Sequence, residues 1–346
     1  TKKWLKINNL MSAKFRIFGA GKWGLAFGNH LSLNGNQVEI YLRDNNKVKQ
    51  YSTTGKYENF PITFDDNLVF KHLNKNLLTS NDDHSYNIIA TSSYGFSDVV
   101  RTYGSYFSKS SNISWLTKGI DHETGLLFHQ IIDQHFESDI DKCIFSGPSF
   151  AHDLIAKKDI LISIASNNNK LVSLLTDASQ SPTFNLRKSN DLIGIEVSGI
   201  IKNIVAILSG IASSLGYGDD EVNILIDKAK NEVKLISSEI TQNYSQMYKI
   251  SSDEAHKTLD SPACHGDMVL SCFDDTSRNR LFGLSLTSCN SIKDLLTQAG
   301  TVEGYYCTRT LFKNKDIYKY GEIVKSAYAI LYDNSDPRKI LEAIFN

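Results

Sequence analysis

Hydrophobic positions divide the chain into an early part of short apolar runs and a later part of long periodic stretches. Up to about residue 190 the short runs alternate with helix-like segments. We expect these runs to be strands: Lys14–Phe18, Gln37–Leu42, Asn87–Ala90, Ile113–Leu116, Cys143–Ser146 and Ile160–Ala165. Strands that alternate with helices form a parallel, doubly wound sheet. The segment Ser52–Ser85 is polar and irregular and predicts no particular element.

The later part carries helical periodicity and no strand pattern. We expect helices over Ile193–Ser214, Glu221–Tyr244 and Thr301–Phe312. Asp336 before Pro337 is typical of an N-cap followed by proline at the first helical position, which predicts a last helix over Pro337–Phe345. The pattern therefore predicts an α/β N-terminal domain over 14–190 and an all-α C-terminal domain over 191–346, after an N-terminal extension over 1–13.

Composition limits the kind of partner that the protein can have. The chain has 346 residues, of which 41% are hydrophobic and 22% charged, and its formal net charge is −1. This is ordinary globular composition with room for two domains. A chain without a polybasic run does not suggest a nucleic-acid or membrane-surface partner. Because no stretch reaches the ~18 consecutive apolar residues of a membrane span, we expect no stable membrane insertion.

The cysteines indicate the cellular compartment. They are odd in number and have no CxxC spacing: Cys143, Cys264, Cys272, Cys289 and Cys307. This pattern is typical of reduced thiols, and not of a disulfide framework or a zinc site. The first ten residues lack the long apolar core of a signal peptide. We therefore expect a cytoplasmic protein with no metal site.

A glycine-rich turn follows the first predicted strand. Gly19, Gly21 and Gly24 form GxGxxG between that strand and a helix. The first glycine allows the tight turn, and the second lets the backbone approach a pyrophosphate. The third lets helix and strand pack closely, with the phosphates at the helix N-terminus. Its position at the start of a βαβ unit predicts a dinucleotide-binding turn.

The end of the second predicted strand bears on the choice of cofactor. An acidic residue there would accept hydrogen bonds from a free ribose 2′-hydroxyl, whereas an arginine would accommodate a 2′-phosphate. The chain has Arg43 followed by Asp44. This order favours NADP(H) slightly and leaves NAD(H) open.

A lysine interrupts the apolar stretch VSGIIKNIVAIL (197–208). At helical spacing Lys202 shares a face with small residues: Ser198, Gly199, Ala206, Ser209 and Gly210. Such a face leaves room for a ligand beside the ammonium group. The alternative is a lysine that snorkels to the surface, or small residues that merely permit close helix packing. The helix alone does not decide between them.

Three other segments offer groups that bind anions. SWLTKGI (114–120) ends a strand with Lys118, at the carboxyl edge where open sheets bind ligands. In FSGPSFA (145–151), Gly147-Pro148-Ser149 is a rigid turn at a helix start. Arg278 can grip phosphate oxygens bidentately, with Asn279 and Ser277 as neutral donors. It belongs to a set of polar residues gathered within 264–283: Asp267, Ser271, Ser277, Arg278, Asn279 and Arg280. Beside a dinucleotide fold, this combination suits a small phosphorylated carbonyl compound.

Together these motifs resemble those of the bacterial-type NAD(P)-dependent glycerol-3-phosphate dehydrogenases, over residues 14 to 313. GAGKWG is similar to the family's GxGxWG, LTKGI to its TKG motif, and SGPSFA to its GPSxA motif. GIEVSGIIKNIVAI (194–207) is similar to its GVELGGALKNVIAI-like helix. HGDMVLSCFDDTSRNRLFG is similar to its GDLxxTCxSxxSRNRxxG, and VEG (302–304) to its closing VEG. The common order of the motifs makes the resemblance specific.

The resemblance implies a Rossmann-type N-terminal domain and a helical C-terminal domain. It also implies a homodimer that reversibly reduces dihydroxyacetone phosphate to sn-glycerol 3-phosphate with NADPH or NADH, feeding glycerophospholipid synthesis. By motif position, Lys202 is the catalytic residue that transfers the proton. The implied substrate residues are Lys118, Gly147, Ser149, Lys202, Asp267, Ser277, Arg278 and Asn279. The implied cofactor residues are Gly19, Gly21, Lys22, Trp23, Gly24, Arg43, Lys118, Ala151, Arg278, Thr301 and Glu303.

Several positions depart from the family pattern: Leu25, Ser92, Asp220, Cys264 and the run Asp227-Lys228-Ala229. We expect the changes at Asp220 and in that run to add charge and bulk near the substrate. They concern pocket detail and turnover more than reaction class. Two alternatives stay open: another lysine-dependent two-domain dehydrogenase, of β-hydroxyacid or ketopantoate type, and a non-catalytic NAD(P)-binding sensor. The first does not predict the SRNR segment, and the second has no need of a proton donor.

Proton transfer by Lys202 requires a perturbed pKa. A free lysine titrates near ~10.4, which is too high for an efficient base at neutral pH. Burial and the like charge of Lys118 would lower the pKa, whereas Asp267 would raise it. We predict a net depression.

Overall fold

The computed structural model describes residues 13–57, 60–74, 85–107, 112–136, 140–243, 248–289, 291–315 and 318–346. The expected N-terminal extension lies outside the described residues except for Ala13. Tyr244, expected to end a helix, also lies outside them, as do residues 75–84 of the segment without a predicted element.

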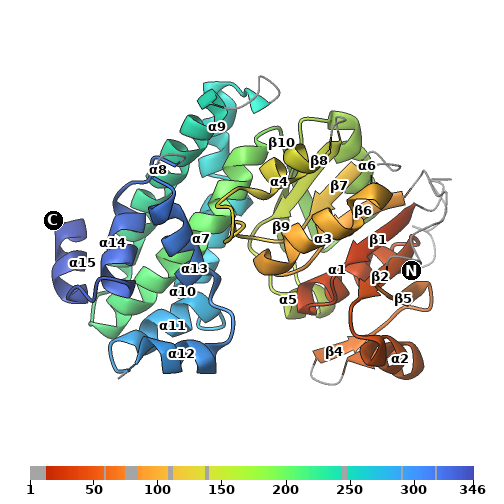
Figure 1. Cartoon of the computed structure of the whole chain (residues 1–346), viewed down its shortest axis with the longest axis horizontal. Coiled ribbons are helices and arrows are strands. Elements are labelled where there is room, and N and C mark those ends of the chain that lie inside the picture. Colours follow the sequence, from red (N-terminus) through yellow and green to blue (C-terminus); the bar gives the residue numbers. More distant parts are fainter. Residues whose placement is uncertain are drawn as a thin grey trace.

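An eight-stranded sheet forms the core of the first part of the chain (Figure 1). Its order is β10-β9-β8-β7-β6-β1-β2-β5. The strands are β1 (Lys14–Phe18), β2 (Gln37–Leu42), β5 (Leu68–His72), β6 (Ser85–Ile89), β7 (Asn112–Trp115), β8 (Asp141–Ser146), β9 (Ile160–Ala165) and β10 (Phe184–Ser189). The strands expected at Lys14–Phe18, Gln37–Leu42 and Ile160–Ala165 are confirmed to the residue, and the other three are shifted at one or both ends.

The sheet is parallel except at one junction. β1 pairs in parallel with β2 and β6, and Phe18 lies opposite Tyr41 and Ile89. β8 and β9 pair antiparallel, so β9 and β10 run against the other strands. The predicted parallel sheet is therefore confirmed for β8, β7, β6, β1, β2 and β5. Strands β9 and β10 run in the opposite direction.

Side chains from both faces of the sheet are buried. In β1, Ile17 belongs to one hydrophobic cluster and Phe18 to another. Because successive strand residues point to opposite faces, both faces are covered, as in a doubly wound sheet. The helices of this part are α1 (Lys22–Leu33), α2 (Asn45–Thr54), α3 (Ser93–Phe107), α4 (Phe128–His135), α5 (Ala151–Ile155) and α6 (Asn169–Ser179). A small antiparallel pair, β3 (Lys56–Tyr57) and β4 (Phe60–Thr63), lies in the segment without a prediction.

Helices make up the second part of the chain, at the left of Figure 1. They are α7 (Leu192–Ser214), α8 (Asp219–Asn243), α9 (Ser252–Leu259), a π-helical turn (Pro262–Gly266), α10 (Asp267–Phe273), α11 (Arg278–Leu286), α12 (Ile292–Ala299), α13 (Glu303–Lys313), α14 (Glu322–Leu331) and α15 (Pro337–Phe345). The expected helices at α7, α8, α13 and α15 are confirmed, and the last is correct to the residue. The division into domains at residues 190 and 191 stays a prediction.

Helix α7 is the central element of the helical part. Asp191 caps its start by accepting a hydrogen bond from Gly194 N at 2.8 Å. The helix packs against α8, α10, α11 and α13. By length and composition α7 could span a membrane, but 94% of its most apolar window is buried inside the protein. The apolar sequence is therefore accounted for by packing against other helices.

Glycines allow α7 and α11 to cross at close range. A Cβ on Gly210 would lie 2.2 Å from Arg280 O, and a Cβ on Gly283 would lie 2.1 Å from Ile207 O. Both contacts are with backbone, which cannot rotate away. The helix crossing, which holds the SRNR segment in place, therefore requires glycine on both sides.

We expect Gly283→Ala to lower the free energy of unfolding by about 3 kcal/mol, because the added methyl must force α7 and α11 apart. Gly218→Ala is the matched control, since its Cβ would meet only Glu221 Oε2, at an ordinary 3.5 Å. Urea denaturation of both variants measures the difference. Equal stability of the two variants would show that the crossing can relax.

Candidate active site

The glycine-rich turn has the geometry of a pyrophosphate site. Gly19 has φ +117°, and its Cβ would lie 2.6 Å from Ala90 O. A Cβ on Gly24 would lie 2.8 Å from Gly19 O, whereas one on Gly21 would meet nothing within 4 Å. No side chain caps the start of α1, which leaves its first N–H groups for a ligand. The turn therefore fits a dinucleotide, with Gly21 facing open space.

The sheet order places this turn at a topological switch point. β1 lies between β2 and β6. The chain adds β2 and β5 on one side of β1 and then returns to add β6, β7 and β8 on the other side. Open parallel sheets bind ligands at this point, outside the carboxyl ends of the strands. Lys118 follows β7 and Gly147 follows β8 at the same edge, because β6, β7 and β8 are parallel.

The two residues after β2 have different roles. Asp44 caps α2 and accepts from Asn46 N at 2.9 Å and from Lys47 N at 3.4 Å. Arg43 is exposed, and its carbonyl oxygen lies 3.0 Å from His72 Nε2. The Asp44 carboxylate is thus engaged in the protein, whereas the Arg43 guanidinium faces solvent.

A buried carboxylate joins the two candidate lysines. Asp267 Oδ2 forms a short ion pair with Lys118 Nζ, which also donates to Gly147 O at 3.0 Å. Asp267 Oδ1 lies 3.5 Å from Lys202 Nζ. Lys202 Nζ donates to Ser271 Oγ at 3.0 Å. Residues from the loop after β7, from α7 and from α10 therefore meet at one point, and the Lys202 ammonium group does not project into bulk solvent.

The small residues on one face of α7 have both of the roles considered from the sequence, which are to leave room beside the lysine and to permit close helix packing. A Cβ on Gly199 would lie 3.5 Å from the Lys118 side chain, so this glycine gives Lys118 room beside Lys202. Further along, Ser209 Oγ donates to Cys272 O at 3.2 Å, and Gly210 meets α11. The first turns therefore border the lysines, and the later turns serve helix packing.

The pKa of Lys202 is depressed, as predicted. Burial lowers it most, the Asp267 carboxylate raises it, and the nearby Lys118 ammonium lowers it again, which brings the pKa to about 8. Near neutral pH both protonation states are therefore accessible. A lysine of this kind can act as proton donor in one direction of a reaction and as acceptor in the other.

The turn after β8 packs tightly against the sheet. A Cβ on Gly147 would lie 2.8 Å from Ile162 Cα, which explains the glycine. Ser149 Oγ donates to Gly147 O at 3.3 Å, and Ala151 begins α5. The Gly147 carbonyl thus connects Ser149 to Lys118.

The SRNR segment divides into structural and exposed groups. Ser277 caps α11 and accepts from Arg280 N at 3.5 Å. Arg280 is held by Asp275 at 2.9 Å and by Ser213 at 3.1 Å, so its role is structural. Arg278 is exposed on the first turn of α11. Of the two arginines, Arg278 is therefore the more exposed.

Asn279 connects α11 to the helices around it. Its Nδ2 donates to Asn203 Oδ1 at 2.9 Å, and its Oδ1 accepts from Gly304 N at 3.0 Å. Asn203 in turn donates to Gly199 O at 3.1 Å. This buried chain of amides fixes α13, and with it Glu303, relative to α7.

The cofactor residues implied by resemblance lie on several elements around the turn. Lys22 and Trp23 belong to the first turn of α1; Lys22 Nζ lies 5.6 Å from the Phe60 ring, and Trp23 stacks on Phe27. Thr301 is exposed before α13, and Glu303 Oε2 accepts from Ser93 Oγ at 2.7 Å. Within the described residues no hydrogen bond or ion pair joins Lys22, Trp23, Arg43 or Thr301 to the Lys118–Asp267–Lys202 cluster.

Comparison with protein families decides the assignment. The model described as "NAD-dependent glycerol-3-phosphate dehydrogenase N-terminus" matches residues 14–172, and the corresponding C-terminus model matches residues 191–342. The chain belongs to the NAD-dependent glycerol-3-phosphate dehydrogenase family.

Curated relatives and solved structures agree with this membership. The chain is 27% identical over 336 residues to a glycerol-3-phosphate dehydrogenase [NAD(P)+] of Colwellia psychrerythraea, with 95% of each chain covered. It is 29% identical to the Bartonella tribocorum enzyme of the same name, covering 91% of this chain and 92% of that one. A Coxiella burnetii glycerol-3-phosphate dehydrogenase structure is similar with TM-score 0.83 and 25% identity, covering 97% and 99% of the two chains. A D-mandelate dehydrogenase structure, at TM-score 0.55 and 15% identity, shares the fold alone.

Family resemblance missed residues that the structure adds to the site. Ser271 holds Lys202 and stands four positions after Asp267 on α10, so helical spacing could have placed it there. Asn203, next to Lys202, binds Asn279. Ser93, which binds Glu303, gave no signal of its own in the sequence.

Most of the residues that depart from the glycerol-3-phosphate dehydrogenase pattern lie either on α8 or in the buried core. Lys228 Nζ forms an ion pair with Glu322 of α14 at 2.7 Å, and Asp220 and Asp227 are exposed. The Lys228 charge is therefore engaged at the contact between α8 and α14, and the expectation that it adds charge near the substrate stays a prediction. Leu25 and Cys264 are fully buried and act in packing.

Proposed function

We propose that the chain reversibly reduces dihydroxyacetone phosphate to sn-glycerol 3-phosphate with NADPH or NADH. The observation that carries this function is the buried Asp267 carboxylate, which holds the ammonium groups of Lys118 and Lys202 at the carboxyl edge of a dinucleotide-binding sheet. Family membership supports the substrate class, a small phosphorylated molecule.

The bound nicotinamide supplies or accepts the hydride. In reduction, Lys202 as ammonium stabilises the developing alkoxide and delivers its proton. With a pKa of about 8, the amine can take that proton back in oxidation. Asp267 orients Lys202, and Lys118 adds a second positive charge near the carbonyl oxygen.

The remaining assignments rest on the resemblance of the motifs to those of the family. Gly19, Gly21 and Gly24 receive the pyrophosphate, with Lys22, Trp23, Ala151, Thr301 and Glu303 around the rest of the cofactor. Ser149, Ser277 and Arg278 contact the substrate, and the Gly147 turn and Asn279 position their neighbours. We also propose a homodimer in the cytoplasm, two domains over 14–190 and 191–346, and a product that feeds glycerophospholipid synthesis.

We propose NADPH as the preferred cofactor. Asp44 is engaged in capping α2, while the exposed Arg43 side chain can reach a 2′-phosphate. Nicotinamide absorbance, followed with dihydroxyacetone phosphate and each reduced cofactor in turn, tests both proposals. Oxidation of neither cofactor, together with measurable binding of one, would favour the non-catalytic sensor.

We expect Arg278→Ala to raise the KM for dihydroxyacetone phosphate roughly 10- to 100-fold, since a charge-assisted hydrogen bond contributes about 1.5–3 kcal/mol. Arg280→Ala, which removes the neighbouring guanidinium held by Asp275, should leave this KM near its original value. Initial rates over a range of substrate concentrations measure both. An unchanged KM in Arg278→Ala would refute the phosphate contact.

A further inference from the structure

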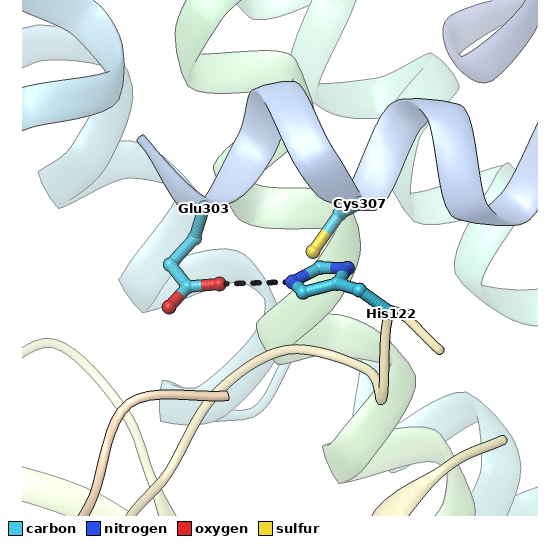
Figure 2. Close-up of side chains that lie close together, drawn as sticks. All are labelled: His122, Glu303 and Cys307. Atoms are coloured by element: carbon cyan, nitrogen blue, oxygen red, sulfur yellow. Dashed lines mark ion pairs between the residues drawn. The ribbon is translucent and has the colours of Figure 1, made fainter. Parts of the chain in front are cut away.

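Three metal-ligating side chains meet beside the proposed cofactor position. Glu303 and Cys307 stand four residues apart on α13, and His122 faces them from the loop after β7 (Figure 2). Their ligand atoms lie within 4.8 Å of one another, and His122 Nε2 is 3.6 Å from Glu303 Oε2. A thiolate, an imidazole and a carboxylate are the ligand types that zinc takes in proteins.

Hydrogen bonds around His122 turn a lone pair toward this point. Thr310 Oγ1 lies 3.0 Å from Tyr306 O and 3.0 Å from His122 Nδ1, so it can donate to the carbonyl oxygen and accept from the ring. A neutral ring then carries its hydrogen on Nδ1 and directs the Nε2 lone pair toward Glu303. Ser93 Oγ lies 3.1 Å from Nε2 but donates its hydrogen to Glu303 at 2.7 Å. Acceptor atoms therefore converge, and a cation between them would satisfy them.

We propose that His122, Glu303 and Cys307 bind one divalent transition-metal ion, for which Zn²⁺ is the best fit. Tetrahedral zinc with bonds near 2.0 Å separates nitrogen and oxygen ligands by about 3.3 Å, close to the 3.6 Å between His122 Nε2 and Glu303 Oε2. The sulfur excludes Mg²⁺ and Ca²⁺, which prefer oxygen ligands. Water can complete the coordination.

Charge also favours a divalent ion. The Cys307 thiol is buried. Metal binding replaces the thiol proton, which is released to solvent, and forms a sulfur–metal bond. One thiolate, one carboxylate and a neutral imidazole then balance the two positive charges of the ion.

Occupation of this site should inhibit the enzyme. Glu303 is a proposed cofactor residue, and a Cβ on Gly119 would lie only 3.4 Å from its Oε2, so the ion would lie next to the Lys118–Gly119 turn. We expect Zn²⁺ to compete with the nicotinamide cofactor. This consequence rests on the proposed function, whereas metal binding itself does not.

Cobalt(II) is a suitable probe, because a cobalt–thiolate bond absorbs in the near ultraviolet. We expect the chelator-dialysed full chain to bind one Co²⁺ with this absorption, and Zn²⁺ to displace it. Cys307→Ser should abolish the band, whereas Cys289→Ser, the matched control at a half-buried cysteine outside the cluster, should keep it. Competition with a chromophoric chelator should show Zn²⁺ affinity at least roughly 10-fold lower in Cys307→Ser.

A second variant tests the site independently, in case Cys307→Ser misfolds. His122→Gln, checked by circular dichroism, should weaken Zn²⁺ binding to a similar degree. Absence of the band in the original protein, or equal Zn²⁺ affinity in the original and a folded variant, would overturn the site. Binding without any rise in the cofactor KM would overturn the competition. Binding by a chain that reduces no triose phosphate would leave the site standing and reject the proposed function.

Discussion

Replacement of Lys202 by alanine should lower kcat roughly 10²-fold or more, which is the loss expected when a general acid–base group is removed. The KM for the cofactor should change little. Lys202 projects from α7 and interacts with Asp267 and Ser271, and the glycine-rich turn lies on the other part of the chain. Steady-state rates in both directions and cofactor titration by nicotinamide fluorescence measure the two effects separately.

Two further variants separate proton transfer from charge. Lys202→Arg keeps a positive charge but cannot titrate near neutral pH, so it should not restore turnover. Lys228→Ala removes a lysine whose partner is Glu322 and should behave like the original protein. Restoration of full activity by arginine would show that Lys202 contributes only its charge.

The sequence predicted the sheet better at its centre than at its edges. In central strands such as β1 and β2 most side chains are buried, so each shows a short run in which apolar residues predominate. Edge strand β10 reads FNLRKS, and its side chains are mostly exposed or half-buried, so no such run marks it. The reversal between β8 and β9 could not be predicted either. An apolar run reports burial of a strand and not its direction.

Motif resemblance placed Lys118, Lys202 and Asp267 in the site but could not describe their connections. Lys118 and Asp267 are separated by 149 positions in the chain, and only the folded chain brings the loop after β7 next to α10. His122 gave no signal, since its partners Glu303 and Cys307 lie on a distant helix. Contacts of this kind follow from tertiary structure and have no local pattern.

Asp267→Asn should lower kcat roughly 10- to 100-fold, because it replaces the carboxylate of two ion pairs with an uncharged amide while keeping the shape of the side chain. Loss of the carboxylate also removes the interaction that raises the Lys202 pKa. Burial and the Lys118 ammonium, which lower the pKa, then prevail further, and the pKa falls below its present value of about 8.

The sign of the resulting pH effect is fixed by the role of Lys202. In glycerol 3-phosphate oxidation the neutral amine is the base, so the rate rises with pH through the Lys202 pKa, and Asp267→Asn should move that rise to lower pH. In the reducing direction the ammonium is the acid, so the fall in rate at high pH should begin at lower pH. Asp253→Asn, which removes an exposed carboxylate paired with Lys257, should leave both profiles in place. A rise that moved to higher pH in Asp267→Asn would mean that the titrating group is not an amine beside Asp267, because removal of a neighbouring negative charge cannot make such an amine easier to protonate.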